Sequence, residues 1–225
     1  MRCENILPHE KNNMPHRYIK KILSANVYDV AVETPVSPAR SLSKRMDNNI
    51  LFKREDLQPI YSFKIRGAYN CISQLSQAQQ ASGLVAASAG NHAQGVAMSA
   101  KYLGINATIV MPKTTPDIKV SSVRALGAEV ILHGDSFAQA YAYSLTLVAD
   151  QGLVYIHPFD DEHVIAGQGT VAVELLRQVQ GHVDAIFVPV GGGGLIAGMS
   201  VYIKYLRPDI KIIGVEPEDA CCLKV

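Results

Sequence analysis

From about Leu84 onward, short apolar segments alternate with stretches that have the hydrophobic spacing of helices. Most of these segments are continuously apolar, as in parallel strands that are covered on both faces. The expected strands are Leu84–Ala87, Ala107–Met111, Glu129–Leu132, Ala185–Val190 and Lys211–Glu216. The expected helices between them are Asn91–Leu103, Pro116–Leu126, Ser136–Ala149, Val164–Val179 and Leu195–Leu206. This order predicts an α/β protein with an open, doubly wound, mostly parallel sheet.

Capping residues and glycines predict where these helices begin and end. Thr115 and Pro116 predict one helix start, with the hydroxyl as cap and the proline in the first turn. Asp135 is expected to cap the next helix in the same way, and Gly104 and Gly127 mark helix ends.

The region before Leu84 has a different pattern. Residues 1–48 contain helix-like pieces, and a strand is expected over Ile50–Lys53. Because no clear linker flanks the middle of the chain, we expect an inserted subdomain instead of two domains in tandem.

The composition is that of an ordinary globular protein of 225 residues, with 48% hydrophobic and 18% charged residues. A formal net charge of +1 gives no indication of a nucleic-acid or anionic-membrane surface. The four cysteines form neither a disulfide scaffold nor a zinc-ligand pattern, which predicts a reducing, cytoplasmic location. They are Cys3, Cys71, Cys221 and Cys222.

One uncharged stretch, Ala185 to Ile203, is long enough to suggest a membrane span. Pro189 and four consecutive glycines interrupt it in the middle. A buried strand followed by a buried helix is therefore expected, and no membrane span.

Lys64 follows Ser62 and Phe63 at the predicted start of a helix. A lysine in an apolar setting has a lowered pKa and a nucleophilic amine, which suits imine chemistry with a carbonyl, above all with pyridoxal phosphate. The alternative is a surface helix on which Lys64 and Arg66 keep their charges in water.

A glycine run follows the expected strand Ala185–Val190 and opens a helix; it consists of Gly191, Gly192, Gly193 and Gly194, followed by Leu195. Free backbone N–H groups at such a helix start favour a phosphate. Without a GK[ST] sequence the run is not a nucleoside-triphosphate loop. Two alternatives stay open, a flexible connection and a dinucleotide fingerprint formed by Gly192, Gly194 and Ala197 with Glu216 on the next strand.

A third candidate site also lies between a strand and a helix, and its residues are Ser88, Ala89, Gly90, Asn91 and His92. Small residues and a run of backbone donors suit a carboxylate, and Asn91 offers a donor to a phenolate oxygen. The alternative is helix capping by Ser88 or Asn91, with His92 as a local hydrogen-bonding residue.

Other polar clusters are interpreted as structural. Phe159–His163 collects groups that bind metals, but acidic residues before a helix favour its dipole. Arg54, Glu55 and Asp56 are expected to form a solvated charge cluster at a strand end. The sequence contains neither HExxH nor GxSxG.

Four segments together carry a resemblance that none carries alone: KREDLQPIYSFKIRGAYN, ASAGNHAQGVA, HPFDDEHVIAGQGT and FVPVGGGGLIAG. The chain resembles the pyridoxal-phosphate enzymes of the tryptophan synthase β fold, called fold type II, from Tyr28 to Lys224. Within them it is similar to the biosynthetic threonine dehydratases. The position of Gln58 and Pro59 before SFK favours these over serine racemase-like relatives.

The resemblance implies a role for each candidate residue. Lys64 would hold pyridoxal phosphate covalently and later remove the substrate Cα proton, and Phe63 would lie against the cofactor ring. Asn91 would contact the O3′ oxygen, Gly191 to Leu195 would bind the phosphate, and Ser88 to His92 would receive the substrate carboxylate.

The resemblance also implies a reaction and an organisation. The expected reaction converts L-threonine, and L-serine as a second substrate, with 2-oxobutanoate and ammonia as the products from threonine, the first step toward isoleucine. Two lobes are expected: residues 1–60 with 165–225 form the larger one, which holds the cofactor phosphate, and 61–164 form a smaller inserted one. The expected partners are a small amino acid and a second copy of the chain, without nucleic acid or membrane.

Two departures from the family qualify these expectations. Cys222 stands where serine racemase-like relatives have an acidic metal ligand, so no metal site is expected. The sequence ends at Val225, so we expect a truncated larger lobe, without the pyridine-nitrogen contact and without the C-terminal regulatory domain. An inactive or partner-dependent remnant and a serine racemase-like enzyme are the alternatives.

Overall fold

The computed structural model describes residues 8–219, with side chains from residue 16 onward. Its main sheet has four parallel strands in the order β5-β4-β3-β6. These strands are β3 (Leu84–Ala87), β4 (Ala107–Met111), β5 (Glu129–Leu132) and β6 (Val154–Tyr155). A second parallel pair is formed by β7 (Ala185–Pro189) and β8 (Lys211–Val215). The α/β class with mostly parallel sheets is thus confirmed.

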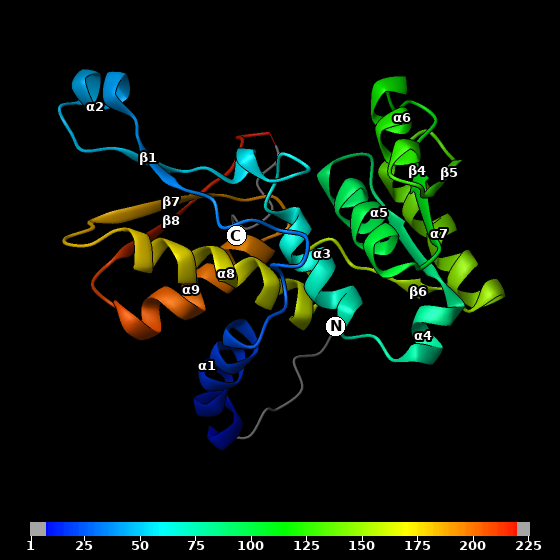
Figure 1. Cartoon of the computed structure of the whole chain (residues 1–225), viewed down its shortest axis with the longest axis horizontal. Coiled ribbons are helices and arrows are strands. Elements are labelled where there is room, and N and C mark those ends of the chain that lie inside the picture. The colour runs from blue at the N-terminus through cyan, green and yellow to red at the C-terminus, as the bar shows by residue number, and fades with distance from the viewer. Residues whose placement is uncertain (1–7, 220–225) are drawn as a thin grey trace.

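Helices cover both sheets and connect them (Figure 1). In that view α4 to α7 surround the four-stranded sheet, α8 and α9 lie beside β7 and β8, and α3 runs between the two groups. The helices are α1 (Pro8–Leu23), α2 (Arg40–Met46), α3 (Lys64–Ser73), α4 (Gln77–Ser82), α5 (Asn91–Leu103), α6 (Asp117–Ala125), α7 (Phe137–Gln151), α8 (Glu162–Gln178) and α9 (Gly194–Leu206). The remaining elements are β1 (Val36–Pro38), antiparallel to β2 (Leu51–Lys53), and the 3-10 turn Glu55–Leu57.

The central strand β3 shows why the apolar runs are continuous. All four of its residues are buried. Leu84 and Ala86 pack with residues of α3, α5 and α6, whereas Val85 packs with Ala140 and Leu147 of α7. Neighbouring side chains of a strand point to opposite faces. Each face of this sheet therefore has its own helical cover, as a doubly wound sheet requires.

Two predicted helix caps are wrong. Helix α6 has Pro116 as its N-cap without a side-chain hydrogen bond, and the hydroxyl of Thr115 is buried with no partner among the described residues. Helix α7 is capped by Ser136, whose hydroxyl accepts from the Gln139 N–H at 3.3 Å. Asp135 instead donates its own N–H to the Gln139 side chain. The glycine ends are confirmed, because Gly104 and Gly127 both have positive φ.

Helix α8 touches α3 and α9 through glycines, at distances that leave no room for a side chain. A Cβ on Gly167 would lie 2.6 Å from the carbonyl oxygen of Arg66 and 2.7 Å from the Cα of Gly67. A Cβ on Gly198 of α9 would lie 2.3 Å from the carbonyl oxygen of Ile165. The backbones of the three helices therefore lie in direct contact, and α8 fixes α3 and α9 relative to each other.

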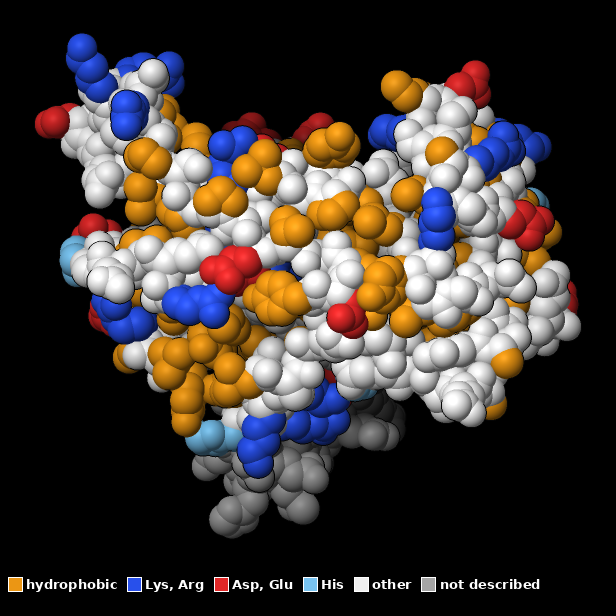
Figure 2. Space-filling view, in the orientation of Figure 1, with side chains coloured by type: hydrophobic (Ala, Val, Ile, Leu, Met, Phe, Trp, Pro, Cys, Tyr) orange, Lys and Arg blue, Asp and Glu red, His pale blue; other side chains and the backbone are white. Residues whose placement is uncertain are grey.

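The uncharged stretch that includes Pro189 forms strand β7 and helix α9, as expected. The expected burial of the strand is wrong, because Val188 is the one buried residue of β7. Among residues 8–219, no helix is long and apolar enough to cross a membrane. Apolar side chains are exposed around this second sheet, with Phe187 of β7 67% exposed. Figure 2 shows hydrophobic side chains gathered where α9 lies in Figure 1, and Tyr205 and Leu206 of α9 are each half exposed.

Gly167→Ala is expected to lower the free energy of unfolding by about 1–3 kcal/mol, because the new methyl group meets backbone atoms that cannot rotate away. Gly191→Ala is the matched control, since nothing lies within 4 Å of its Cβ position. Urea unfolding followed by circular dichroism measures both variants. Equal midpoints for the two variants would contradict the close contact of α8 with α3.

Candidate functional site

The amine of Lys64 lies in a partly buried position at the first residue of α3. Its Nζ donates to the carbonyl oxygen of Pro158 at 2.7 Å and lies 5.5 Å from the centre of the Phe63 ring. Burial lowers the pKa of Lys64 to about 8. A substantial share of this amine is therefore neutral near physiological pH, which a nucleophile and a proton acceptor both require.

The start of α3 is fixed by its own neighbours in the sequence. The buried Ser62 hydroxyl accepts from the Lys64 N–H at 3.3 Å. Tyr61 just before it has a positive φ of 58° and is 80% exposed, a conformation that L-residues rarely adopt. The chain thus bends sharply at Tyr61 and turns Phe63 and Lys64 inward.

The segment from Ser88 to His92 joins β3 to α5 beside this lysine. Gly90 is the N-cap of α5 and no side chain caps the helix, so the capping alternative for Ser88 and Asn91 is not observed. The Ser88 hydroxyl accepts from the Gly90 N–H at 3.2 Å. Asn91 is exposed at the helix start, where its side chain is accessible to a ligand.

His92 points into the protein and is almost completely buried. Its Nε2 lies 2.9 Å from the carbonyl oxygen of Ile156, so Nε2 carries the proton and donates. Nδ1 is a buried acceptor without a partner among the described residues. Burial lowers the pKa of His92 to about 4, and this imidazole is neutral at physiological pH.

The glycine loop Gly191–Gly194 connects β7 to α9, which begins at Gly194. Gly193 has a φ of 87°, and the first N–H groups of α9 have no partner within the helix. A Cβ on Gly192 would lie 2.1 Å from the ring of Phe159. A cavity of about 420 Å³ opens here, lined by the loop, Phe159 and Ser200 among others.

The segment between β6 and α8 brings these parts together. Ile156 contacts His92, Pro158 contacts Lys64, and Phe159 packs on the glycine loop. The sequence indicated Phe159 only as part of a cluster before a helix. Asp161 does cap α8, because its carboxylate accepts from the N–H groups of His163 and Val164 at 2.8 and 2.9 Å.

These residues fit pyridoxal phosphate on their own chemistry. The glycine loop has no side chains of its own, and the first N–H groups of α9 lack a partner within the helix, as a phosphate site requires. Lys64 supplies an amine that burial keeps partly neutral. The expectation that this chain has no metal site is based on Cys222, which lies outside the described residues.

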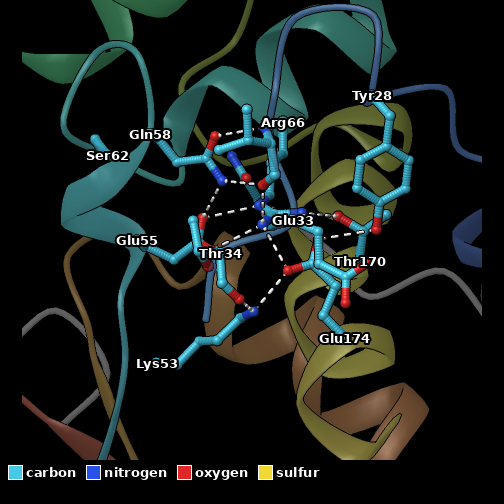
Figure 3. A network of polar contacts seen from close by, with 12 residues as sticks. Tyr28, Glu33, Thr34, Lys53, Glu55, Gln58, Ser62, Arg66, Thr170 and Glu174 are labelled. Carbon is cyan, nitrogen blue, oxygen red and sulfur yellow. Dashed lines mark hydrogen bonds and ion pairs between the residues drawn. The ribbon is translucent and has the colours of Figure 1, made fainter. Parts of the chain in front are cut away.

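A buried network of charged residues surrounds Arg66, which follows Lys64 by two positions on α3 (Figure 3). Arg66 is fully buried, bonds both carboxylate oxygens of Glu55 at 2.8 Å and bonds Glu174 at 2.5 and 3.0 Å. Glu174 also accepts from Lys53 at 2.6 Å and from the Tyr28 hydroxyl at 2.8 Å. Two cations and two anions therefore balance in the interior.

This pairing decides the protonation of the network. Burial alone would raise the pKa of Glu174, but hydrogen bonds from Arg66, Lys53 and Tyr28 and the charge of Arg66 outweigh it and lower the pKa. Burial opposes the charge of Arg66, yet bonds to Glu55 and Glu174 raise its pKa. Both groups are therefore charged at physiological pH.

The surface alternative for Arg66 is excluded, and the expectation for Glu55 is wrong. Arg66 is not a surface residue of α3, because partners from three other segments enclose it. Glu55 is not part of a solvated cluster, since its carboxylate binds Arg66 and the Thr34 hydroxyl. Only Arg54 and Asp56 form the expected exposed pair. The local sequence gave no signal for this, because the partner Glu174 lies 108 positions from Arg66.

Comparisons with known proteins identify the family of this chain. The family described as pyridoxal-phosphate-dependent enzymes matches residues 27–224. This chain therefore belongs to the pyridoxal-phosphate-dependent enzyme family, and the family assignment replaces the dinucleotide alternative.

Individual relatives show which members of the family this chain resembles. The biosynthetic L-threonine dehydratase of Burkholderia multivorans is 56% identical over 92% of this chain and 42% of its own length. The processed threonine deaminase isoform 2 of Solanum lycopersicum has a TM-score of 0.88 at 51% identity, over 91% of this chain and 56% of that one. Maize serine racemase has a TM-score of 0.84 at 38% identity, over 90% of this chain and 61% of that one. The chain thus spans less than half the length of the curated relative.

Arg66→Met is expected to lower the free energy of unfolding by about 3–5 kcal/mol, because it leaves Glu174 and Glu55 buried with too little positive charge. Arg54→Met, which breaks only the exposed pair with Asp56, is the control and should leave the urea midpoint nearly unchanged. A loss below about 1 kcal/mol for Arg66→Met would contradict the buried network.

Lys64 is expected to react with an acylating reagent with a midpoint near pH 8, because only the neutral amine reacts and burial lowers its pKa. Pulse labelling at several pH values, followed by peptide mass spectrometry, gives the profile. In 8 M urea the midpoint should move to about 10.4, the ordinary value for lysine. A midpoint of the folded chain at the urea value would show that the amine is solvated.

Proposed function

We propose that this chain carries the cofactor-binding part of a lyase that converts L-threonine to 2-oxobutanoate and ammonia. The observation that carries the proposal is the Lys64 amine, partly neutral and oriented by a backbone carbonyl at the start of α3. The substrate is proposed from the relatives named threonine dehydratase and threonine deaminase. L-Serine, which lacks only the methyl group of threonine, is the proposed second substrate.

The proposed binding roles follow the positions of the backbone donors. The N–H groups from Gly191 to Leu195 hold the cofactor phosphate at the start of α9, and Phe63 covers the cofactor ring. Ser88, Ala89, Gly90, Asn91 and His92 form the turn whose backbone receives the substrate carboxylate. Asn91 is exposed at the start of α5 and donates its amide to the phenolate oxygen of the cofactor.

The proposed chemistry depends on one proton acceptor. When bound, pyridoxal phosphate supplies an electron sink that stabilises negative charge at the substrate Cα. Neutral Lys64 Nζ accepts the Cα proton, and the Pro158 carbonyl holds the amine in place. The β-hydroxyl leaves as water, and hydrolysis of the product takes up one water, so the net change is the release of ammonia.

The remaining expectations stay proposals. The lobe boundaries are residues 1–60 with 165–225 and residues 61–164, and a second copy of the chain is the proposed partner. A cytoplasmic location rests on the cysteine pattern, while relatives carry the names chloroplastic and mitochondrial. The place of this reaction in isoleucine biosynthesis is proposed from relatives called biosynthetic.

Similarity to maize serine racemase supports a second candidate, a racemase-like enzyme that inverts L-serine at Cα. Both candidates use Lys64 to accept the same proton, and they differ in whether the β-hydroxyl is lost. Chiral analysis of serine and an assay of 2-oxobutanoate from threonine, run on the same sample, distinguish them.

Borohydride reduction of the chain incubated with pyridoxal phosphate is expected to add the cofactor's mass to the Lys64 peptide. Reduction makes the bond between the Lys64 nitrogen and the carbonyl carbon of the cofactor stable to hydrolysis. A visible absorption band should be present in the parent and absent in Lys64→Ala. Lys101→Ala, which removes an exposed lysine at the end of α5, is the control and should keep the band. Parent protein that never takes up pyridoxal phosphate would refute the proposal.

A further inference from the structure

The segment His157–Asp161 is the physical connection between Lys64 and the glycine loop. The carbonyl oxygen of Pro158 accepts from Lys64 Nζ at 2.7 Å. The ring of Phe159 occupies the space next to Gly192, and its carbonyl oxygen lies 2.8 Å from a Cβ position on Gly194. A displacement of this short segment would therefore change both halves of the candidate site at once.

The imidazole of His157 holds the turn within this segment. Its Nδ1 lies 2.7 Å from the Asp160 N–H and 3.3 Å from the Phe159 N–H, so one ring nitrogen accepts two backbone donors. Because Nδ1 accepts, the proton of the neutral ring is on Nε2. The ring also meets Tyr155 and Phe159 edge to face, with centroid distances of 6.0 and 4.7 Å.

Charged and titratable groups face His157 from each neighbouring element. Tyr155 comes from β6, Lys64 from α3 and His92 from α5, while Asp160 and Asp161 lie in the same turn. Burial lowers the pKa of His157 below its ordinary value, the two aspartates oppose this change, and Lys64 supports it. The ring is neutral at physiological pH and keeps its acceptor.

We propose that His157 is a positioning residue, whose Nδ1 fixes the turn that directs the Pro158 carbonyl toward Lys64 and packs Phe159 on the glycine loop. The proposal rests on the proposed function only for the roles of Lys64 and the glycine loop. Protonation of Nδ1 replaces an acceptor with a donor, and the two N–H groups then lose their partner. The turn is therefore released as the pH falls through the pKa of His157.

Two variants and a control test this role on the chain without added cofactor. His157→Leu removes the acceptor, while His157→Asn keeps an amide oxygen near the position of Nδ1. His133→Leu is the control, since His133 stacks on Tyr143 at 4.0 Å and does not contact this segment. Amide hydrogen exchange measured by NMR gives protection factors for Phe159 and Asp160, with the amides of β3 as the reference for global folding.

His157→Leu is expected to reduce the protection of the Asp160 amide roughly fivefold to tenfold, because one hydrogen bond is lost. His157→Asn should restore most of it, and His133→Leu should leave it unchanged. The Lys64 modification midpoint should rise in His157→Leu toward the ordinary lysine value, since the opened turn admits water. Unchanged protection in His157→Leu, or no restoration by asparagine, would overturn the proposal.

If His157→Leu does not fold, a pH titration of the parent chain tests the positioning role of His157 instead. Protection of the Asp160 amide should fall as the pH is lowered through the His157 pKa, while the β3 amides stay protected. Protection of the Asp160 amide that stays constant while the ring protons of His157 titrate in the same NMR series would refute the role. None of these measurements uses threonine or the cofactor, so a failed threonine assay refutes the proposed function without refuting the role of His157.

Discussion

The arrangement of the candidate site depends on the direct backbone contact of α8 with two other helices. Gly167 lies against the carbonyl of Arg66 in α3, and Gly198 of α9 lies against the carbonyl of Ile165. Helix α3 begins at Lys64, and α9 begins at the glycine loop. The separation between the Lys64 amine and the proposed phosphate site is therefore set by main-chain contacts, which are stiffer than contacts between long side chains.

The same helix also carries the anion that pairs the buried charges. Glu174 binds Arg66 of α3, Lys53 of β2 and Tyr28 of the segment before β1. Such a network gains little net stability over an apolar core, but removing one of its members leaves a charge buried without a partner. Glycine contacts and paired charges thus both join α8 to α3, the first through the main chain and the second through side chains.

Much of this architecture could be predicted from the sequence, where local signals were strong. Continuous apolar runs indicated the strands, and four glycines after a strand indicated the loop. Short elements such as β6, with two residues, gave no pattern of their own. The burial of Arg66 and Glu55 depends on partners far away in the chain, so local charge patterns misidentified them. The wrong caps at Thr115 and Asp135 were errors of one residue, at helix boundaries where neighbouring residues compete.

The atom that orients the Lys64 amine is the main-chain oxygen of Pro158. Every residue type supplies such an oxygen, so no point mutation at position 158 can delete it, as one can delete a carboxylate or a hydroxyl. Evolution can adjust this contact only by moving the backbone, through the residues that shape the turn. The environment of Lys64 is thus determined jointly by several residues of the turn, and none of their side chains provides the atom that contacts the amine.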